Sequence, residues 1–432
     1  MSTQTKVVEK KYLISFILIT SLFALWGFAN DITNPMVAAF KTVMEISNAK
    51  ASLVQFAFYG GYATMAIPAA LFVQKFSYKK GIILGLALYA TGALLFWPAA
   101  QYQAFGFFLV SLYILTFGLA FLETTSNPYI LSMGSEETST RRLNLAQAFN
   151  PMGSLLGMYV ASKVVLASLE SDKQRNAAGE LIFSSLDEVT KATMRANDLM
   201  VIRNPYVALG IVVIVMLVVI AFAKMPQTGH ATHIHPLDSF KRLIKNKTYR
   251  EGVIAQVFYV AAQIMCWTFI IQYADNLGID KATAQMYNIV AMGIFLGSRF
   301  ISTFLMKYVN SRKLLMFFAI GGMCTVSGAI LIEGMPGLYC LVATSAFMSL
   351  MFPTIYGIAL EGIGQDATLG AAGLVMAIVG GALMPPLQGT IIDMEQVGFL
   401  AAVNFSFILP LISFLVITIY AYRSYKTQKI NI

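Results

Sequence analysis

The chain has 432 residues, of which 57% are hydrophobic and only 12% are charged, and its mean hydropathy is +0.69. Ordinary globular domains carry about 25% charged residues, so this composition excludes a soluble enzyme, a disordered protein and a DNA-binding module. An outer-membrane β-barrel is excluded as well, because its strands alternate and are only mildly apolar. What remains is a polytopic bundle of membrane helices.

The apolar runs predict an all-α membrane protein with twelve transmembrane helices in two six-helix halves. Each run is long enough to cross about 30 Å of hydrocarbon at about 1.5 Å per residue. In the first half we place helices at residues 12–40, 50–74, 81–102, 104–133, 143–168 and 204–224. In the second half we place them at residues 249–275, 282–308, 312–333, 336–363, 367–393 and 397–422. The predicted organisation is an N-terminal half (1–224), a hydrophilic linker (225–248) and a C-terminal half (249–432).

The distribution of basic residues predicts the orientation of the bundle. Most of the 30 Lys and Arg residues fall on one side, at the two termini, in the linker and in the loops near residues 75–80 and 307–313. Such an excess marks cytoplasmic loops, so we expect both termini and the linker to be cytoplasmic. The net charge of +9 therefore reflects membrane topology, and we expect no nucleic-acid partner.

Three charged residues lie inside predicted spans: Asp31 in the first, Glu123 in the fourth and Arg299 in the eighth. A charge at mid-bilayer costs roughly 2.5–3.5 kcal/mol on insertion scales, so such a residue marks a functional site more often than a structural ion pair. No histidine lies in a predicted span, so a proton carrier must be a carboxylate. We predict that Asp31 carries the coupling proton, with Glu123 as a second proton-linked residue.

Arg299 is the only cationic residue well inside a predicted span. We expect it to face the cavity or a partner and to help set the balance of inward-open and outward-open states. The alternative is that its side chain extends toward the membrane interface.

Polar and aromatic side chains accompany these charges at helical spacing. Amides both donate and accept hydrogen bonds, as a ligand rich in hydroxyl groups requires. On the seventh span Gln256, Gln263 and Trp267 share one face, where the indole could stack on a sugar ring. The alternative is hydrogen bonding between helices. The residues predicted to bind substrate are Asn34, Glu123, Asn127, Gln147, Asn150, Gln263, Trp267 and Arg299.

Other motifs give no support for metal, cofactor or enzyme chemistry. The linker histidines His230, His233 and His235 have no Cys or clustered carboxylate beside them, so we interpret them as a solvated loop. The cysteines lack CxxC spacing and are interpreted as small core residues. There is no P-loop, GxSxG or HExxH motif. We therefore expect neither an ATP-driven pump nor an enzyme, and no cofactor beside a coupling proton.

The twelve-span, two-half layout resembles the major facilitator superfamily, and within it the fucose:proton symporter group is similar over most of the chain. The strings that carry this resemblance include Gln55-Phe-Ala-Phe-Tyr-Gly-Gly-Tyr62, Leu122-Glu-Thr-Thr-Ser-Asn-Pro128, Arg142-Leu-Asn-Leu-Ala-Gln-Ala-Phe-Asn150, Ala255-Gln-Val-Phe-Tyr-Val-Ala-Ala-Gln263, Cys266-Trp267 and Gly364-Gln-Asp366.

The resemblance implies proton-driven monosaccharide import across a bacterial inner membrane. It assigns the sugar-contacting carboxylate of the fourth span to Glu123 and matches Gln147, Asn150, Trp267 and Arg299. Two departures stand out. The first-span acid of the family falls on Asn34 without gaps, while Asp31 lies three residues earlier on the same helical face. The Gln-Tyr-Pro string of the second half is replaced by Met351-Phe-Pro353.

We therefore expect an L-fucose:proton symporter that works as a monomer in the lipid bilayer. The rivals are a glucose or galactose importer of the same family and a non-transporting membrane sensor built on the same bundle.

Overall fold

The computed structural model describes residues 7–33, 36–46, 48–51, 53–174, 176, 182–226, 236–279, 281–392, 394, 396–398 and 400–430. The predicted site residue Asn34 and the linker histidines His230, His233 and His235 lie outside the described residues.

The first half of the chain contains the elements from η1 to α11. The elements are η1 (Lys10–Tyr12), α1 (Leu13–Thr33), α2 (Met36–Val43), α3 (Asn48–Ala51), α4 (Leu53–Lys75), α5 (Tyr78–Leu94), α6 (Phe96–Gln101), α7 (Phe105–Leu131), η2 (Glu136–Thr138), α8 (Ser139–Gln147), α9 (Asn150–Tyr159), the π-helical turn η3 (Val160–Val165), η4 (Leu166–Ser168), α10 (Glu170–Lys173), η5 (Phe183–Ser185) and α11 (Glu188–Phe222).

The second half follows a short linker helix, α12 (Pro236–Lys245). Its elements are α13 (Lys247–Thr268), α14 (Ile270–Asn276), α15 (Lys281–Leu305), α16 (Ser311–Leu331), α17 (Met335–Met348), α18 (Met351–Leu360), η6 (Gly364–Asp366), α19 (Ala367–Met376), η7 (Ala377–Val379), α20 (Gly380–Ile392), β1 (Gln396–Val397), β2 (Leu400–Ala401), α21 (Ala402–Phe405) and α22 (Ile408–Ile430). The two strands form one antiparallel hairpin with Val397 opposite Leu400.

The predicted all-α membrane fold is confirmed, although the third, fifth, seventh, tenth and eleventh predicted spans each consist of more than one helical segment. Within the described residues, eleven helices are long and apolar enough to cross a membrane by length and composition. In the fifth predicted span the chain leaves the helix at Ala148 and Phe149, between α8 and α9. Pro151, at the start of α9, lacks a backbone N–H and cannot continue the ladder of α8. The fifth span is therefore two helical segments with a break at cavity level.

Several predicted boundaries differ from the structure, the sixth and twelfth spans by the most. The twelfth span was expected to begin at residue 397, but the chain forms the β1–β2 hairpin there and α22 begins at Ile408. The sixth span was expected to begin at residue 204, but α11 begins at Glu188, where the Asp187 carboxylate caps it by accepting a hydrogen bond from the Thr190 amide. The linker holds the helix α12, whose Arg242 forms two 2.7 Å hydrogen bonds to Asp366. This contact raises the pKa of Arg242 and fixes α12 against the start of α19.

Small residues allow the helices of the first half to pack closely. A Cβ atom at Gly153 would lie 1.7 Å from the Ala24 carbonyl oxygen, and one at Gly27 would lie 2.0 Å from the Asn150 carbonyl oxygen. Helices α1 and α9 thus touch backbone to backbone, as small residues permit in membrane bundles. This contact brings the polar residues of α1 and α9 to the same wall.

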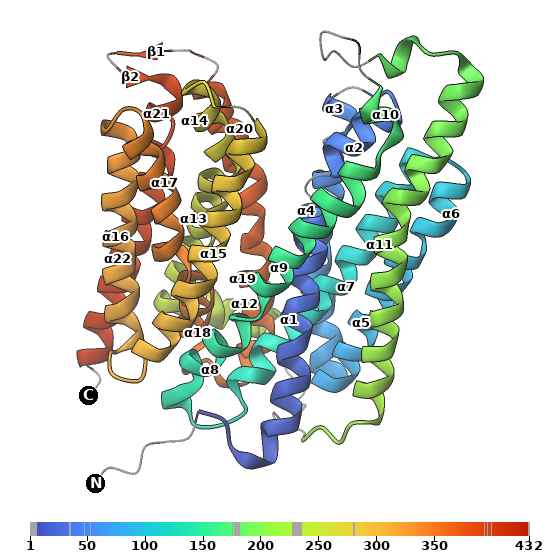
Figure 1. Cartoon of the computed structure of the whole chain (residues 1–432). Helices are drawn as coiled ribbons and strands as arrows, with labels where there is room; N and C mark the ends of the chain where they lie inside the picture. The colour runs from blue at the N-terminus through green and yellow to red at the C-terminus, as the bar shows by residue number, and fades with distance from the viewer. Residues whose placement is uncertain are drawn as a thin grey trace.

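The two halves stand side by side, with the beginning of α1 and the end of α22 at the same end of the bundle (Figure 1). We call this the terminal end and the other the open end. Hydrogen bonds between described residues of the two halves include four that lie at the cavity or between it and the terminal end. They pair Tyr78 with Thr368 at 3.0 Å, Glu136 with the Gly362 amide at 3.0 Å, Asn144 with Thr354 at 3.1 Å, and Arg299 with the Gln147 carbonyl at 3.1 Å.

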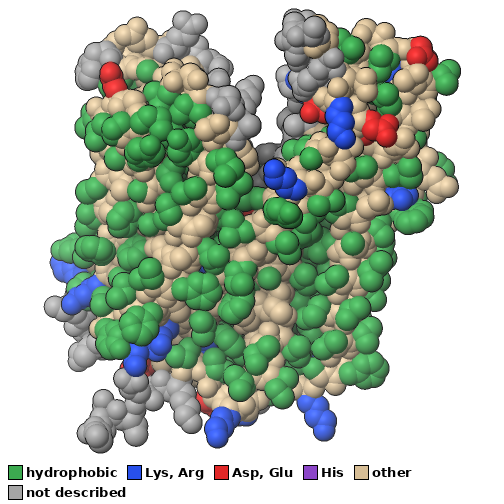
Figure 2. Space-filling view, viewed as in Figure 1, with side chains coloured by type: hydrophobic (Ala, Val, Ile, Leu, Met, Phe, Trp, Pro, Cys, Tyr) green, Lys and Arg blue, Asp and Glu red, His purple; other side chains and the backbone are tan. Residues whose placement is uncertain are grey.

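Away from the terminal end the halves separate, and Figure 2 shows a cleft between them that opens at the top of the view. Hydrophobic side chains cover most of the outer flanks below it. Helix α11, for example, exposes Phe222 at 86% and Val215 at 56%. Such a surface is suited to lipid rather than to water.

Candidate functional site

A cavity of about 140 Å³ lies between the two halves at the base of the cleft. Seven of the predicted site residues line it: Asp31, Glu123, Gln147, Asn150, Gln263, Trp267 and Arg299. They come from α1, α7, α8, α9, α13 and α15. Residues that are scattered along the sequence are thus brought to one chamber, as membrane transporters arrange their central sites.

Two carboxylates lie on the wall that the first half contributes. Asp31 is only 6% exposed and lies near the C-terminal end of α1. Glu123 lies in the middle of α7, and its buried Oε2 atom has no hydrogen-bond partner among the described residues. An unpaired buried acceptor costs about 1–3 kcal/mol, so Glu123 is suited to receive a proton or a ligand hydroxyl there.

The amides of the fifth span are held by different partners. The Gln147 side chain donates a 3.0 Å hydrogen bond to the Oδ1 atom of Asn127, and the Asn150 side chain donates a 3.1 Å bond to the Phe23 carbonyl. Both side chains face the cavity on either side of the break after α8. Asn127 is fully buried behind Gln147 and is not on the cavity wall, so the structure places it as a support for Gln147.

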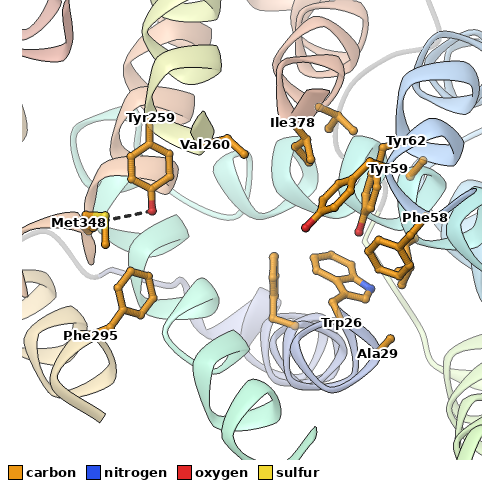
Figure 3. Close-up of a cluster of buried hydrophobic side chains, with 14 of the residues drawn as sticks. Trp26, Ala29, Phe58, Tyr59, Tyr62, Tyr259, Val260, Phe295, Met348 and Ile378 are labelled. Carbon is orange, nitrogen blue, oxygen red and sulfur yellow. Dashed lines mark hydrogen bonds between the residues drawn. The ribbon is translucent and has the colours of Figure 1, made fainter. Parts of the chain in front are cut away.

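The second half contributes mainly aromatic groups. The Trp267 indole donates a 3.1 Å hydrogen bond to the Ser345 hydroxyl and meets Phe295 edge to face, with ring centroids 5.0 Å apart. Tyr259 donates to the Met348 carbonyl at 3.2 Å, the contact drawn as a dashed line in Figure 3. These contacts hold the rings in fixed positions on this wall.

Arg299 connects the two halves through backbone contacts. Its guanidinium donates to the Ser349 carbonyl of its own half and, at 3.1 Å, to the Gln147 carbonyl of the other half. It also lies over the Phe295 ring at 4.6 Å. No ion pair between Arg299 and a carboxylate is found within the described residues, and the partners of its guanidinium are carbonyl groups. At 4% exposure its side chain does not extend to the membrane interface.

Several cavity residues were not predicted. Asn30, Tyr59, Tyr62 and Tyr259 all line the chamber, and Figure 3 shows the rings of Tyr59 and Tyr62 across an open space from Tyr259. The three tyrosines belong to sequence strings that resemble the fucose:proton symporter group, and this resemblance could have been used to predict them as site residues. Gln256, in contrast, shares the spacing of Gln263 but is fully buried off the cavity wall.

Known transporters are similar to this chain over almost its whole length. A sequence model of the Major Facilitator Superfamily matches residues 16–385. An L-fucose-proton symporter of Haemophilus influenzae is 65% identical over 98% of this chain and 99% of its own. A glucose/galactose transporter of Brucella abortus is 29% identical over 95% of this chain and 94% of its own. These relatives are transporters rather than enzymes, as the sequence led us to expect.

A solved structure is similar over almost the whole chain. The crystal structure of the major facilitator transporter FucP in the outward conformation superimposes with a TM-score of 0.86 at 32% identity, and it covers 96% of this chain and 99% of its own. The closed terminal end and the open cleft described above agree with this likeness.

Proposed function

This chain belongs to the major facilitator superfamily, and we propose that it is a proton-coupled importer of L-fucose that works by alternating access. The observation that carries the proposal is the chamber itself, where an unpaired carboxylate oxygen and several amides face aromatic rings. The 65% identity to an L-fucose-proton symporter, against 29% to a glucose/galactose transporter, favours L-fucose over the rival sugars.

The two walls fit the two sides of a 6-deoxy sugar. Hydroxyl groups need donors and acceptors, which Glu123, Gln147 and Asn150 supply. A methyl group in place of the exocyclic hydroxymethyl needs an apolar surface, which Phe295 and Phe352 supply on the opposite wall. Phe352 belongs to the string in which this chain departs from the family pattern, and the departure makes this part of the wall more apolar.

Proton coupling is assigned to Asp31 and Glu123 in this proposal. Both carboxylates lie in the chamber, and burial in an apolar environment disfavours a lone negative charge unless a proton or a partner compensates it. Asp31 would take up and release the driving proton. Glu123 would contact the sugar and share in the coupling.

We assign the terminal end to the cytoplasm of a bacterial inner membrane. The Lys-rich segments near residues 75–80 and 307–313 belong to that end, as the positive-inside rule requires. The described conformation then accepts sugar from outside, and opening of the terminal end delivers it inside. We propose a monomer as the working unit.

The test is uptake by the purified chain in proteoliposomes, with and without an inwardly directed proton gradient. L-fucose should accumulate only with the gradient. L-galactose, which differs from L-fucose by a hydroxyl on the methyl carbon, should compete poorly. Preferred uptake of D-glucose or D-galactose would favour the rival importer, and the absence of transport of any sugar would favour a sensor.

A further inference from the structure

Polar side chains continue below the cavity toward the terminal end. On α7, Asn127 follows Glu123 by four residues, and on α8, which runs in the opposite direction, Asn144 precedes Gln147 by three. On α18, Tyr356 lies one turn closer to the terminal end than the cavity wall. Three helices from both halves thus add a polar layer under the chamber.

The atoms of this layer are buried and largely unpaired. The Asn127 Nδ2, Asn144 Oδ1 and Tyr356 hydroxyl atoms have no hydrogen-bond partner within the described part of the chain, and the same holds for the hydroxyls of Thr124 and Ser126. All five of these residues are 0% exposed. Buried polar atoms normally find a protein partner or an internal water.

Tyr356 connects this layer to the coupling carboxylate. Its hydroxyl lies beside the Asn127 side chain of the other half, and Asn127 is one helical turn from Glu123 on α7. The adjacent Asn144 side chain donates a 3.1 Å hydrogen bond to Thr354, so the layer is part of the seal at the terminal end. A proton that leaves Glu123 toward this end must cross the layer.

We propose that Tyr356 is a proton-path residue that joins Glu123 to the solution at the terminal end through internal water. This inference rests on the proposed proton symport. The Glu123 carboxylic acid gives its proton to a water molecule and becomes a carboxylate. The Tyr356 oxygen accepts a proton from that water while its own hydroxyl proton passes to the next water. Tyr356 ends neutral, and one positive charge has moved toward the terminal end.

The hydroxyl is the part of Tyr356 that the path requires. A tyrosine hydroxyl both donates and accepts, whereas a phenylalanine ring of nearly the same shape does neither. The Tyr356 hydroxyl forms no hydrogen bond of standard geometry within the described residues and lies beside the Asn127 side chain, so its removal should leave the fold intact. Tyr420 offers a matched control, since its hydroxyl is also buried and unpaired among the described residues but lies between α22 and Gly252 of α13, outside the polar layer.

The experiment compares wild type, Tyr356→Phe and Tyr420→Phe in proteoliposomes. Net L-fucose uptake with proton influx and L-fucose counterflow, which moves no net proton, are measured on the same preparations. We expect Tyr356→Phe to lower net uptake about five-fold or more, the effect of one lost hydrogen-bonding group, and to keep wild-type counterflow. Its net uptake should also slow more in D₂O than that of wild type. Tyr420→Phe should match wild type throughout.

Three outcomes would overturn the inference. They are wild-type net uptake in Tyr356→Phe, an equal loss of net uptake and counterflow, and a D₂O effect unchanged from wild type. If wild type itself shows no L-fucose-dependent proton influx while L-fucose is still transported, the proposed proton coupling is wrong and the inference falls with it.

Discussion

The two walls of the cavity differ in chemistry, although they belong to halves of similar size. Both halves contribute aromatic rings, among them Trp26, Tyr59 and Tyr62 from the first half and Tyr259, Trp267, Phe295 and Phe352 from the second. The lining carboxylates and the amides of the fifth span come from the first half, whereas the lining cation, Arg299, comes from the second, with Gln263 beside it. The difference indicates a division of roles. The first half carries proton coupling and hydroxyl recognition, and the second half fixes the sugar ring by shape and ties the halves together.

The largest expected effect comes from removing the first-half acid. Asp31→Asn keeps the shape of the side chain but cannot exchange a proton, so accumulation of L-fucose against a gradient should be abolished. Counterflow should survive, because it needs no net proton movement. Uptake and counterflow assays on one preparation check this. Normal accumulation in the variant would move the coupling carboxylate elsewhere.

Next in size is the loss of the carboxylate that faces the sugar. Glu123→Ala removes an acceptor from a buried site, which should cost about 1–3 kcal/mol, or roughly 5- to 150-fold in L-fucose affinity. Calorimetry on the purified protein measures it. An unchanged affinity would remove Glu123 from the binding site and would leave hydroxyl recognition to the amides.

Arg299 tests whether the second half ties the halves together. Arg299→Ala removes the 3.1 Å bond to the Gln147 carbonyl, and a hydrogen bond from a charged donor is worth about 1.5–3 kcal/mol. The balance should shift about ten-fold or more toward the state open at the terminal end, with transport rate changed more than sugar affinity.

Accessibility of introduced cysteines at each end of the cavity reports this shift, in a background without Cys266, Cys324 and Cys340. Wild-type rate, affinity and accessibility together would contradict a role of Arg299 in gating.

These expectations show how far sequence reasoning reached. Asp31, Glu123 and Arg299 could be found because charge is rare inside membrane spans. The hydrogen-bond partners of Arg299 could not be predicted, because they are the backbone carbonyl groups of Gln147 and Ser349, and every residue has a backbone carbonyl. Helical spacing placed Asn127 on the same face of α7 as Glu123. Whether a residue on that face lines the cavity or is buried below it depends on how the two halves pack, which the spacing does not specify.

The stacking role of the second half predicts a smaller effect. Trp267→Ala should weaken L-fucose binding by about 0.5–1.5 kcal/mol, or roughly 2- to 13-fold, because it removes one aromatic contact. Ser345→Ala is the companion variant, since it frees the indole N–H but keeps the ring. If Ser345→Ala weakens binding more than Trp267→Ala, the ring does not contact the sugar.

The smallest effect should follow from Asn127→Ala. This change frees the Gln147 side chain, whose 3.0 Å bond to Asn127 is worth about 0.5–1 kcal/mol, so affinity should fall roughly 2- to 5-fold. In a Gln147→Ala background the same change should have little further effect. A full additional loss in that background would indicate that Asn127 contacts the sugar itself.

The central claim, that sugar and proton move together, is tested most directly by adding L-fucose to proteoliposomes that carry no ion gradient and recording the external pH. We predict an immediate rise in external pH with L-fucose, abolished in Asp31→Asn and much smaller with D-galactose. Uptake of L-fucose without any pH change, or uptake that depends on sodium instead, would contradict proton symport.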